Sequence, residues 1–137
     1  MILSKDKLKN YQNFVDQVTS KYSKNSEHLI ERLKYVDDND IEVSRILTAG
    51  VGLSGEVGEF NEILKKIIFQ EKSITDTTIS HLKKELGDIM WYIAQASIAL
   101  DTDIEELIDI NEKKLRSRFN GDSFDPKKSE VKKPDDL

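Results

Sequence analysis

The chain has 137 residues, of which 34% are charged and 37% hydrophobic, and its formal net charge is −5. This length suits one domain with a core and is short for two. The negative charge argues against broad binding to nucleic acid. The absence of Cys excludes disulfides and thiolate metal sites. The N-terminus (MILSKDKLKN) turns charged too early for a signal peptide, and no apolar stretch is long enough to span a bilayer, so we expect a cytoplasmic protein without membrane contact.

Helix is favoured throughout, because only 2 Pro and 6 Gly occur and β-branched runs are scarce. Apolar residues at helical spacing predict a first amphipathic helix over about residues 5–23. Ser26 is positioned to cap a second, shorter helix, which ends at the Asp-Asp-Asn-Asp turn of residues 37–40. Asn39 and Glu42 have the spacing of a capping box for the third helix.

The third predicted helix is long, reaches about residue 70 and contains four glycines, Gly50, Gly52, Gly55 and Gly58. Glycine costs roughly 1 kcal/mol per helical site relative to alanine. We therefore interpret these glycines as positions where another helix or a ligand comes close to the backbone.

Two further helices complete the prediction. A polar connection over residues 71–77 leads to a helix over about 78–100. Thr102 and Glu105 then form another capping box, which opens a helix that ends near residue 119. We predict an all-α fold, an antiparallel bundle of four to five helices over residues 1–119 as a single domain. Residues 120–137, rich in Gly, Pro and charge, are predicted to be an irregular C-terminal tail.

Two acidic pairs stand out on neighbouring predicted helices: Glu56 with Glu59, and Glu85 with Asp88. Their i, i+3 spacing projects both members of each pair from one helix face. At about 100° per residue, Glu56 and Glu85 fall within the apolar stripes, Glu59 and Asp88 at the stripe margins, and Glu62 well outside. Four carboxylates packed together would repel one another unless a cation lay between them, and a divalent metal is the simplest candidate.

The last predicted helix carries an amide and two cations on or beside its apolar side: Asn111, Lys114 and Arg118. Such groups make sense opposite an anion held by the metal. Carboxylate oxygens suit Mg²⁺, which typically binds through few protein ligands together with substrate phosphates. The pattern therefore predicts a metal–phosphate site.

These residues resemble those of the MazG-type all-α nucleoside triphosphate pyrophosphohydrolases. The family pattern is ExxE, a variable gap and ExxD, and here it reads GEVGE ending at Glu59 and KELGD ending at Asp88. The run NEKKLRSRF supplies the family's Asn, Lys and Arg on the last helix. The resemblance covers about residues 47–124.

The resemblance implies hydrolysis of an NTP or dNTP to the monophosphate and pyrophosphate, with Mg²⁺ or Mn²⁺ as cofactor. The metal would polarise the phosphate chain and lower the pKa of an attacking water. One glutamate would accept that water's proton, and which one stays open. The resemblance also implies a homodimer or homotetramer. The implied metal-binding and catalytic residues are the four acids, Glu56, Glu59, Glu85 and Asp88, and the implied phosphate-binding residues are Asn111, Lys114 and Arg118.

Aromatic residues suggest where a base would bind. Tyr92 follows Asp88 by one helical turn on the same face and is a candidate to stack on a nucleobase. Trp91 points to another side and is expected to pack or to lie at a subunit interface. Lys66 is a weaker phosphate candidate, for which a solvated lysine is the better interpretation.

Three other functions compete with this one. A di-iron bundle requires Glu-x-x-His motifs, and Asn25 and Thr78 stand where the glutamates before His28 and His81 would be. A non-catalytic nucleotide-binding or regulatory module would keep the bundle without turnover. Hydrolysis of an alarmone nucleotide would use the same metal site.

Overall fold

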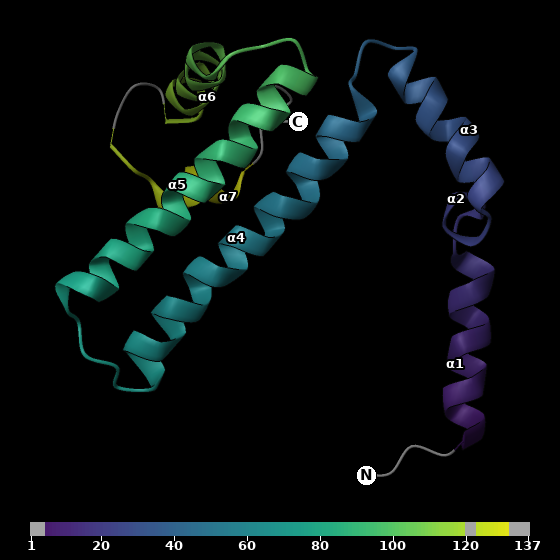
Figure 1. The fold of residues 1–137 in the computed structure, drawn as a ribbon, viewed down its shortest axis with the longest axis horizontal. Coiled ribbons are helices and arrows are strands. Elements are labelled where there is room, and N and C mark those ends of the chain that lie inside the picture. The colour runs from purple at the N-terminus through teal and green to yellow at the C-terminus, as the bar shows by residue number, and fades with distance from the viewer. Residues whose placement is uncertain (1–4, 120–122, 132–137) are drawn as a thin grey trace. The chain divides into compact units, whose positions relative to one another are not determined.

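The computed structural model describes residues 5–119 and 123–131, and within these ranges all regular structure is helical (Figure 1). This confirms the predicted all-α class. The chain divides into two compact units, residues 1–43 and 44–137, which are described separately. The predicted single domain over residues 1–119 stays a prediction.

The first unit contains α1 (Lys5–Val18), α2 (Lys21–Lys24) and α3 (Ser26–Asp37). The prediction of one continuous helix to residue 23 was wrong beyond Val18. The hydroxyl of Thr19 donates to the carbonyl of Val15 at 2.6 Å, and the Ser20 hydroxyl accepts from the backbone N–H of Tyr22 to cap α2. Such side-chain bonds to the backbone compete with helix continuation, so the chain restarts at Ser20.

Asn25, rather than the predicted Ser26, caps α3, because its Oδ1 accepts from the backbone N–H of His28 at 3.0 Å. Both residue types are good N-caps. The backbone at Asn25 is extended, as is typical of an N-cap residue, and α3 therefore begins at Ser26.

The capping box predicted for Asn39 and Glu42 stays a prediction. The amide of Asn39 donates to the carbonyl of Tyr35 at 2.7 Å and so satisfies the end of α3. The backbone N–H of Val43, the first residue of the next helix, donates to Oδ1 of Asp37 at 3.1 Å. The turn is made by Asp40, whose φ of 63° is in the left-handed region.

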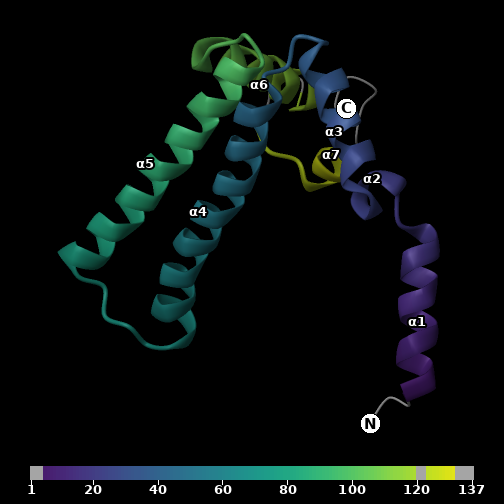
Figure 2. The ribbon, with the colours of Figure 1, turned by 45° about the vertical axis from the view of Figure 1, so that its right-hand side comes forward.

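The second unit holds the long helices α4 (Val43–Phe69) and α5 (Asp76–Ala99), followed by α6 (Ile104–Phe119) and α7 (Pro126–Glu130). α4 and α5 run side by side as an antiparallel hairpin in both views (Figures 1 and 2). α6 packs on α5, and α7 packs on α6. The long helices end close to where the sequence predicted.

Side-chain caps set the starts of α5 and α6. Thr75 accepts from the backbone N–H of Thr78 at 3.2 Å, so α5 begins two residues earlier than predicted. Asp103 accepts from the backbone N–H of Glu106 at 2.8 Å, which moves the cap of α6 one residue beyond the predicted Thr102. Thr102 donates to the Glu106 carboxylate instead. The capping box of α6 was recognised in the right place but assigned a register one residue too early.

The prediction that the whole C-terminal tail is irregular was wrong, because its residues Pro126–Glu130 form the helix α7. Asp125 caps this short helix by accepting from the backbone N–H of Lys127 at 2.9 Å, and Pro126 occupies its first position. Asp followed by Pro is a helix-start signal that the composition of the tail obscured. The rings of Phe119 and Phe124 lie 5.8 Å apart and connect the end of α6 to this segment. Residues 120–122 and 132–137 of the predicted tail lie outside the described residues.

Only one of the four glycines in α4 is explained by a neighbouring helix. A Cβ at Gly52 would overlap the ring of Tyr92 from α5. A Cβ at Gly50, Gly55 or Gly58 would meet nothing within 4 Å among the described residues, so no other helix of this chain explains those three, and close approach of a ligand there stays a prediction. The two long helices are also joined by a hydrogen bond of 2.6 Å from Arg45 to Gln95.

Candidate metal centre

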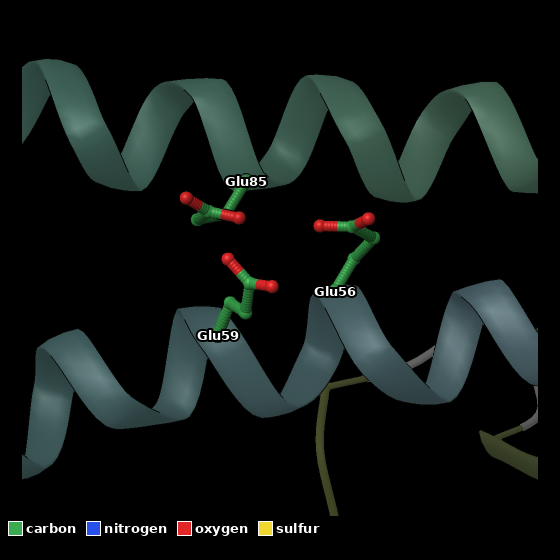
Figure 3. Close-up of side chains that lie close together, drawn as sticks. All are labelled: Glu56, Glu59 and Glu85. Atoms are coloured by element: carbon green, nitrogen blue, oxygen red, sulfur yellow. The ribbon is translucent and has the colours of Figure 1, made fainter.

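Three carboxylates converge between the two long helices. Glu56 and Glu59 extend from α4 toward α5, and Glu85 extends from α5 toward them (Figure 3). One carboxylate oxygen of each residue lies within 4.8 Å of those of the other two. We call these three residues the acid cluster. The i, i+3 spacing on α4 places two of its members on one face, and the antiparallel hairpin brings the third from a segment distant in sequence.

The acid cluster perturbs its own ionisation. Partial burial raises the pKa of Glu56 above its ordinary value of 4.5, and the negative charges of Glu59, Asp88 and Glu85 raise it further. A hydrogen bond with Glu85 adds to the effect. All of these causes disfavour the charged form of Glu56. The site therefore favours uptake of positive charge, either as a proton or as a cation.

Asp88, the fourth predicted ligand, is exposed and lies outside the group of three converging carboxylates. Its charge nevertheless contributes to the raised pKa of Glu56, which places it in the same electrostatic environment. The structure thus brings three of the four predicted acids together and sets the fourth beside them.

The donor set fits a hard divalent cation. Octahedral Mg²⁺ binds oxygens at about 2.0–2.1 Å, so neighbouring ligand oxygens lie about 3 Å apart and opposite ones about 4 Å. The 4.8 Å spread of the acid cluster is slightly wider than this. Glutamate side chains have three rotatable bonds and can close such a difference without movement of the helices. The residues therefore fit Mg²⁺ or Mn²⁺.

Glu62, on the same helix, has a different environment. Its carboxylate pairs with Lys65 and, at 3.4 Å, with Lys66. The hydrogen bond from Lys65 is the main cause that lowers the pKa of Glu62, against the opposing effect of desolvation. Lys66 is thus engaged by a surface carboxylate, in agreement with its interpretation as a solvated lysine.

The family model for the MazG nucleotide pyrophosphohydrolase domain matches residues 46–121, more than half of the chain. The match includes both acidic pairs. The chain belongs to the MazG family. This confirms the family and fold indicated by the sequence, and it supports a coarse assignment to nucleotide pyrophosphohydrolase-like proteins.

A relative of this MazG domain is the Gene 37 protein of Mycobacterium phage L5. The two are 41% identical over 69 residues, which are 50% of this chain and 60% of the phage protein. The match therefore spans less than two thirds of that relative. No solved structure matches this chain.

Tyr92 of the MazG domain is partly buried beside Gly52, and its ring meets Trp91 edge-on with centroids 4.8 Å apart at 90°. This packing assigns Tyr92 a role between the helices. Its base-stacking role stays a prediction. Trp91 is 53% exposed, and its place at a subunit interface stays a prediction.

The predicted phosphate-binding residues lie on α6. Asn111 lines an open cavity of about 610 Å³ between α5 and α6, whose other walls are mainly apolar, including Met90 and Ile93. Lys114 and Arg118 are partly buried on the same helix. None of these residues shares a helix with the acid cluster, and their phosphate-binding role stays a prediction.

The sequence did not indicate that Lys127 and Lys128 lie beside Arg118. They line a cavity of about 270 Å³ together with Arg118 and Val131. The missed signal was the Asp125–Pro126 helix start, which brings the basic residues of α7 against α6.

No helix in the described parts of the chain has the length and apolarity required to cross a membrane.

Proposed function

We propose that this MazG domain catalyses the Mg²⁺-dependent hydrolysis of an NTP or dNTP to the monophosphate and pyrophosphate. The observation that carries the proposal is the convergence of Glu56, Glu59 and Glu85 from two helices within 4.8 Å, inside the segment that matches the family. Three carboxylates at this separation are costly unless a cation compensates their charge.

In the proposed mechanism, the acid cluster and Asp88 hold Mg²⁺ or Mn²⁺. When bound, the metal supplies charge neutralisation on the polyphosphate and activation of the attacking water. The raised pKa of Glu56 favours its protonated form, so proton and metal compete for this carboxylate and metal binding should weaken as pH falls. One glutamate of the site accepts the proton of the attacking water.

The remaining roles follow the family resemblance. We propose that Asn111, Lys114 and Arg118 bind phosphate oxygens, because amide and cationic groups complement the charge left on a metal-bound polyphosphate. We also propose Tyr92 as a contact for the base, with its ring between Gly52 and Trp91 fixing its orientation.

The proposal includes a cytoplasmic homodimer or homotetramer. Large apolar side chains on α4 and α5 remain exposed, and covering them in an oligomer would remove them from water. They are Ile68, Phe69, Met90, Trp91 and Ile98, between 47% and 79% exposed. Light scattering of the purified chain should report two or four copies, and a monomer at micromolar concentration would contradict this part of the proposal.

The deciding experiment is a panel of canonical and modified NTPs and dNTPs, assayed for pyrophosphate release with Mg²⁺ and with EDTA. We expect Mg²⁺-dependent release from at least one substrate and none in EDTA. Glu59→Gln should abolish release while circular dichroism shows an intact fold. Full activity in Glu59→Gln would refute the site assignment, and tight nucleotide binding without release would favour the non-catalytic module.

A further inference from the structure

The two long helices of the second unit come closest where the sequence has removed a side chain. The Tyr92 ring of α5 occupies the space that a Cβ at Gly52 of α4 would need, and its Cε1, Cζ and Cδ1 atoms are the nearest. Trp91 meets the same ring edge-on, with the two ring centroids 4.8 Å apart. The contact therefore depends on glycine at position 52.

This contact is in register with the acid cluster. Glu59 follows Gly52 by two helical turns on α4, and Glu85 precedes Tyr92 by two turns on α5. Because α4 and α5 are antiparallel, these two steps run in the same direction. Glu59 and Glu85 therefore lie at the same level along the helix pair, about 10 Å from the contact. On the other side of the contact, the hydrogen bond from Arg45 to Gln95 joins the helices at 2.6 Å.

We propose that Gly52 and Tyr92 are positioning residues that set the separation of α4 and α5 and thereby hold Glu56 and Glu59 within reach of Glu85. We call this contact the spacer. The inference rests on the proposed metal site but assigns a role to residues outside the acids. Neither Gly52 nor the Tyr92–Gly52 contact takes part in the chemical step in this proposal.

The spacer acts through distance. The separation of two packed helices depends on the side chains at their contact and is typically 8–10 Å. A methyl group at position 52 forces the ring to rotate or the helices to separate. Mg²⁺ requires near-ideal octahedral ligand positions. The 4.8 Å spread of the acid cluster already takes up the freedom of its rotatable side chains, so a further separation of α4 and α5 by about 1 Å weakens the site.

The same helix supplies a matched control. Gly55 lies less than one turn beyond Gly52, and a Cβ there meets nothing within 4 Å. Alanine at either position gives the same gain in intrinsic helix propensity. Any difference between the two variants therefore reports the contact with Tyr92 rather than the loss of glycine.

The first measurement is Mn²⁺ affinity of the full chain by calorimetry. We expect Gly52→Ala to weaken binding at least tenfold and Gly55→Ala to change it less than twofold. Removing the ring should remove the effect, so Gly52→Ala combined with Tyr92→Ala should bind Mn²⁺ within threefold of Tyr92→Ala alone. A lowered melting temperature with unchanged Mn²⁺ affinity in Gly52→Ala would mean a merely structural contact and would overturn the proposal.

The second measurement is independent of metal. Because the chain has no Cys, nitroxide labels can be attached at engineered cysteines replacing the exposed Asn61 on α4 and Lys83 on α5. Pulsed electron paramagnetic resonance without metal should give a longer mean distance in the Gly52→Ala background than in the Gly55→Ala background. Equal distances would refute the spacer. If Gly52→Ala lengthened the distance but the wild-type chain bound no Mn²⁺, the proposed metal site and the spacer's role in it would be refuted.

Discussion

Two glutamates on α4 have opposite electrostatic environments although they lie less than two turns apart. Glu56 faces the acidic residues Glu59, Glu85 and Asp88, and its pKa is raised, with partial burial as the largest cause. Glu62 faces two lysines, and its pKa is lowered. Residue type and helix are the same, so the direction that each side chain faces decides between a metal-ligand candidate and an ordinary surface ion pair.

The comparison also shows what separates a site from a charged surface. The lysines beside Glu62 are its i+3 and i+4 neighbours on its own helix, and local sequence supplies them. Glu85, by contrast, reaches Glu56 only because α5 folds back along α4 (Figures 1 and 3). The negative charge of Glu62 is compensated by lysines of its own helix. Compensation of the negative charge of the acid cluster requires a proton or a cation from outside the two helices.

The largest expected effect is on turnover. Glu85→Gln should reduce pyrophosphate release at least 100-fold, because it removes the ligand that α5 contributes. Glu62→Gln, the matched control on the surface, should retain activity within twofold. Steady-state rates with saturating Mg²⁺ check this, and equal losses in both variants would show that general charge, rather than the acid cluster, governs activity.

The second expected effect is on thermal stability with metal. A ligand at 100 times its Kd stabilises the folded state by about 2.7 kcal/mol, so Mn²⁺ should raise the melting temperature of the wild-type chain by several degrees. The rise should persist in Glu62→Gln and disappear when Glu56 and Glu59 are both replaced by Gln. Scanning calorimetry with Mn²⁺ and with EDTA makes the comparison, and a persistent rise in the double variant would place the metal elsewhere.

The third effect is a pH dependence of opposite sign at the two glutamates in EDTA. The folded state holds the Glu56 proton more tightly than the unfolded state does, so wild-type stability attributable to Glu56 falls as pH rises above 4.5 toward its raised pKa. Glu56→Gln should therefore exceed the wild type in stability at pH 7 and differ less at pH 4. For Glu62, whose pKa is lowered, stability is present above 4.5 and is lost as pH falls through the folded value.

Urea unfolding at pH 4 and pH 7 measures both glutamates in one series. Glu62→Gln should be less stable than the wild type at pH 7 and approach it at low pH. If Glu56→Gln and Glu62→Gln changed stability in the same direction at pH 7, the claim that the two glutamates have opposite electrostatic environments would be refuted.

The smallest expected effect is the contribution of the Glu62 ion pairs. Glu62 and both lysines are 44–50% exposed in their side chains. Exposed pairs at this spacing contribute little to stability, and salt screens them. The loss in Glu62→Gln should therefore shrink between 0.05 and 0.5 M NaCl, as measured by urea unfolding. A loss that salt left unchanged would point to packing of the Glu62 stem instead.

The sequence predicted the long helices well, because their apolar periodicity extends over many turns and averages out local exceptions. It was less successful at helix starts. At Asn25, Thr75 and Asp103, several neighbouring residues are all good caps, and only the path of the chain entering the helix selects one. The helix α7 was missed because the Gly, Pro and charged residues around it favoured an irregular tail. The helix-start signal consists of only two residues, Asp125 and Pro126.

For the site, the sequence by itself determined the acidic pairs, since residue spacing fixes which carboxylates share a helix face. Tertiary structure decided the rest. The hairpin of α4 and α5 determined that Glu85 joins the acid cluster while Asp88 stays beside it. It also decided that Gly52, alone among the four glycines of α4, meets another helix. Periodicity describes one helix at a time, whereas the distance between helices depends on the side chains that meet at their contact.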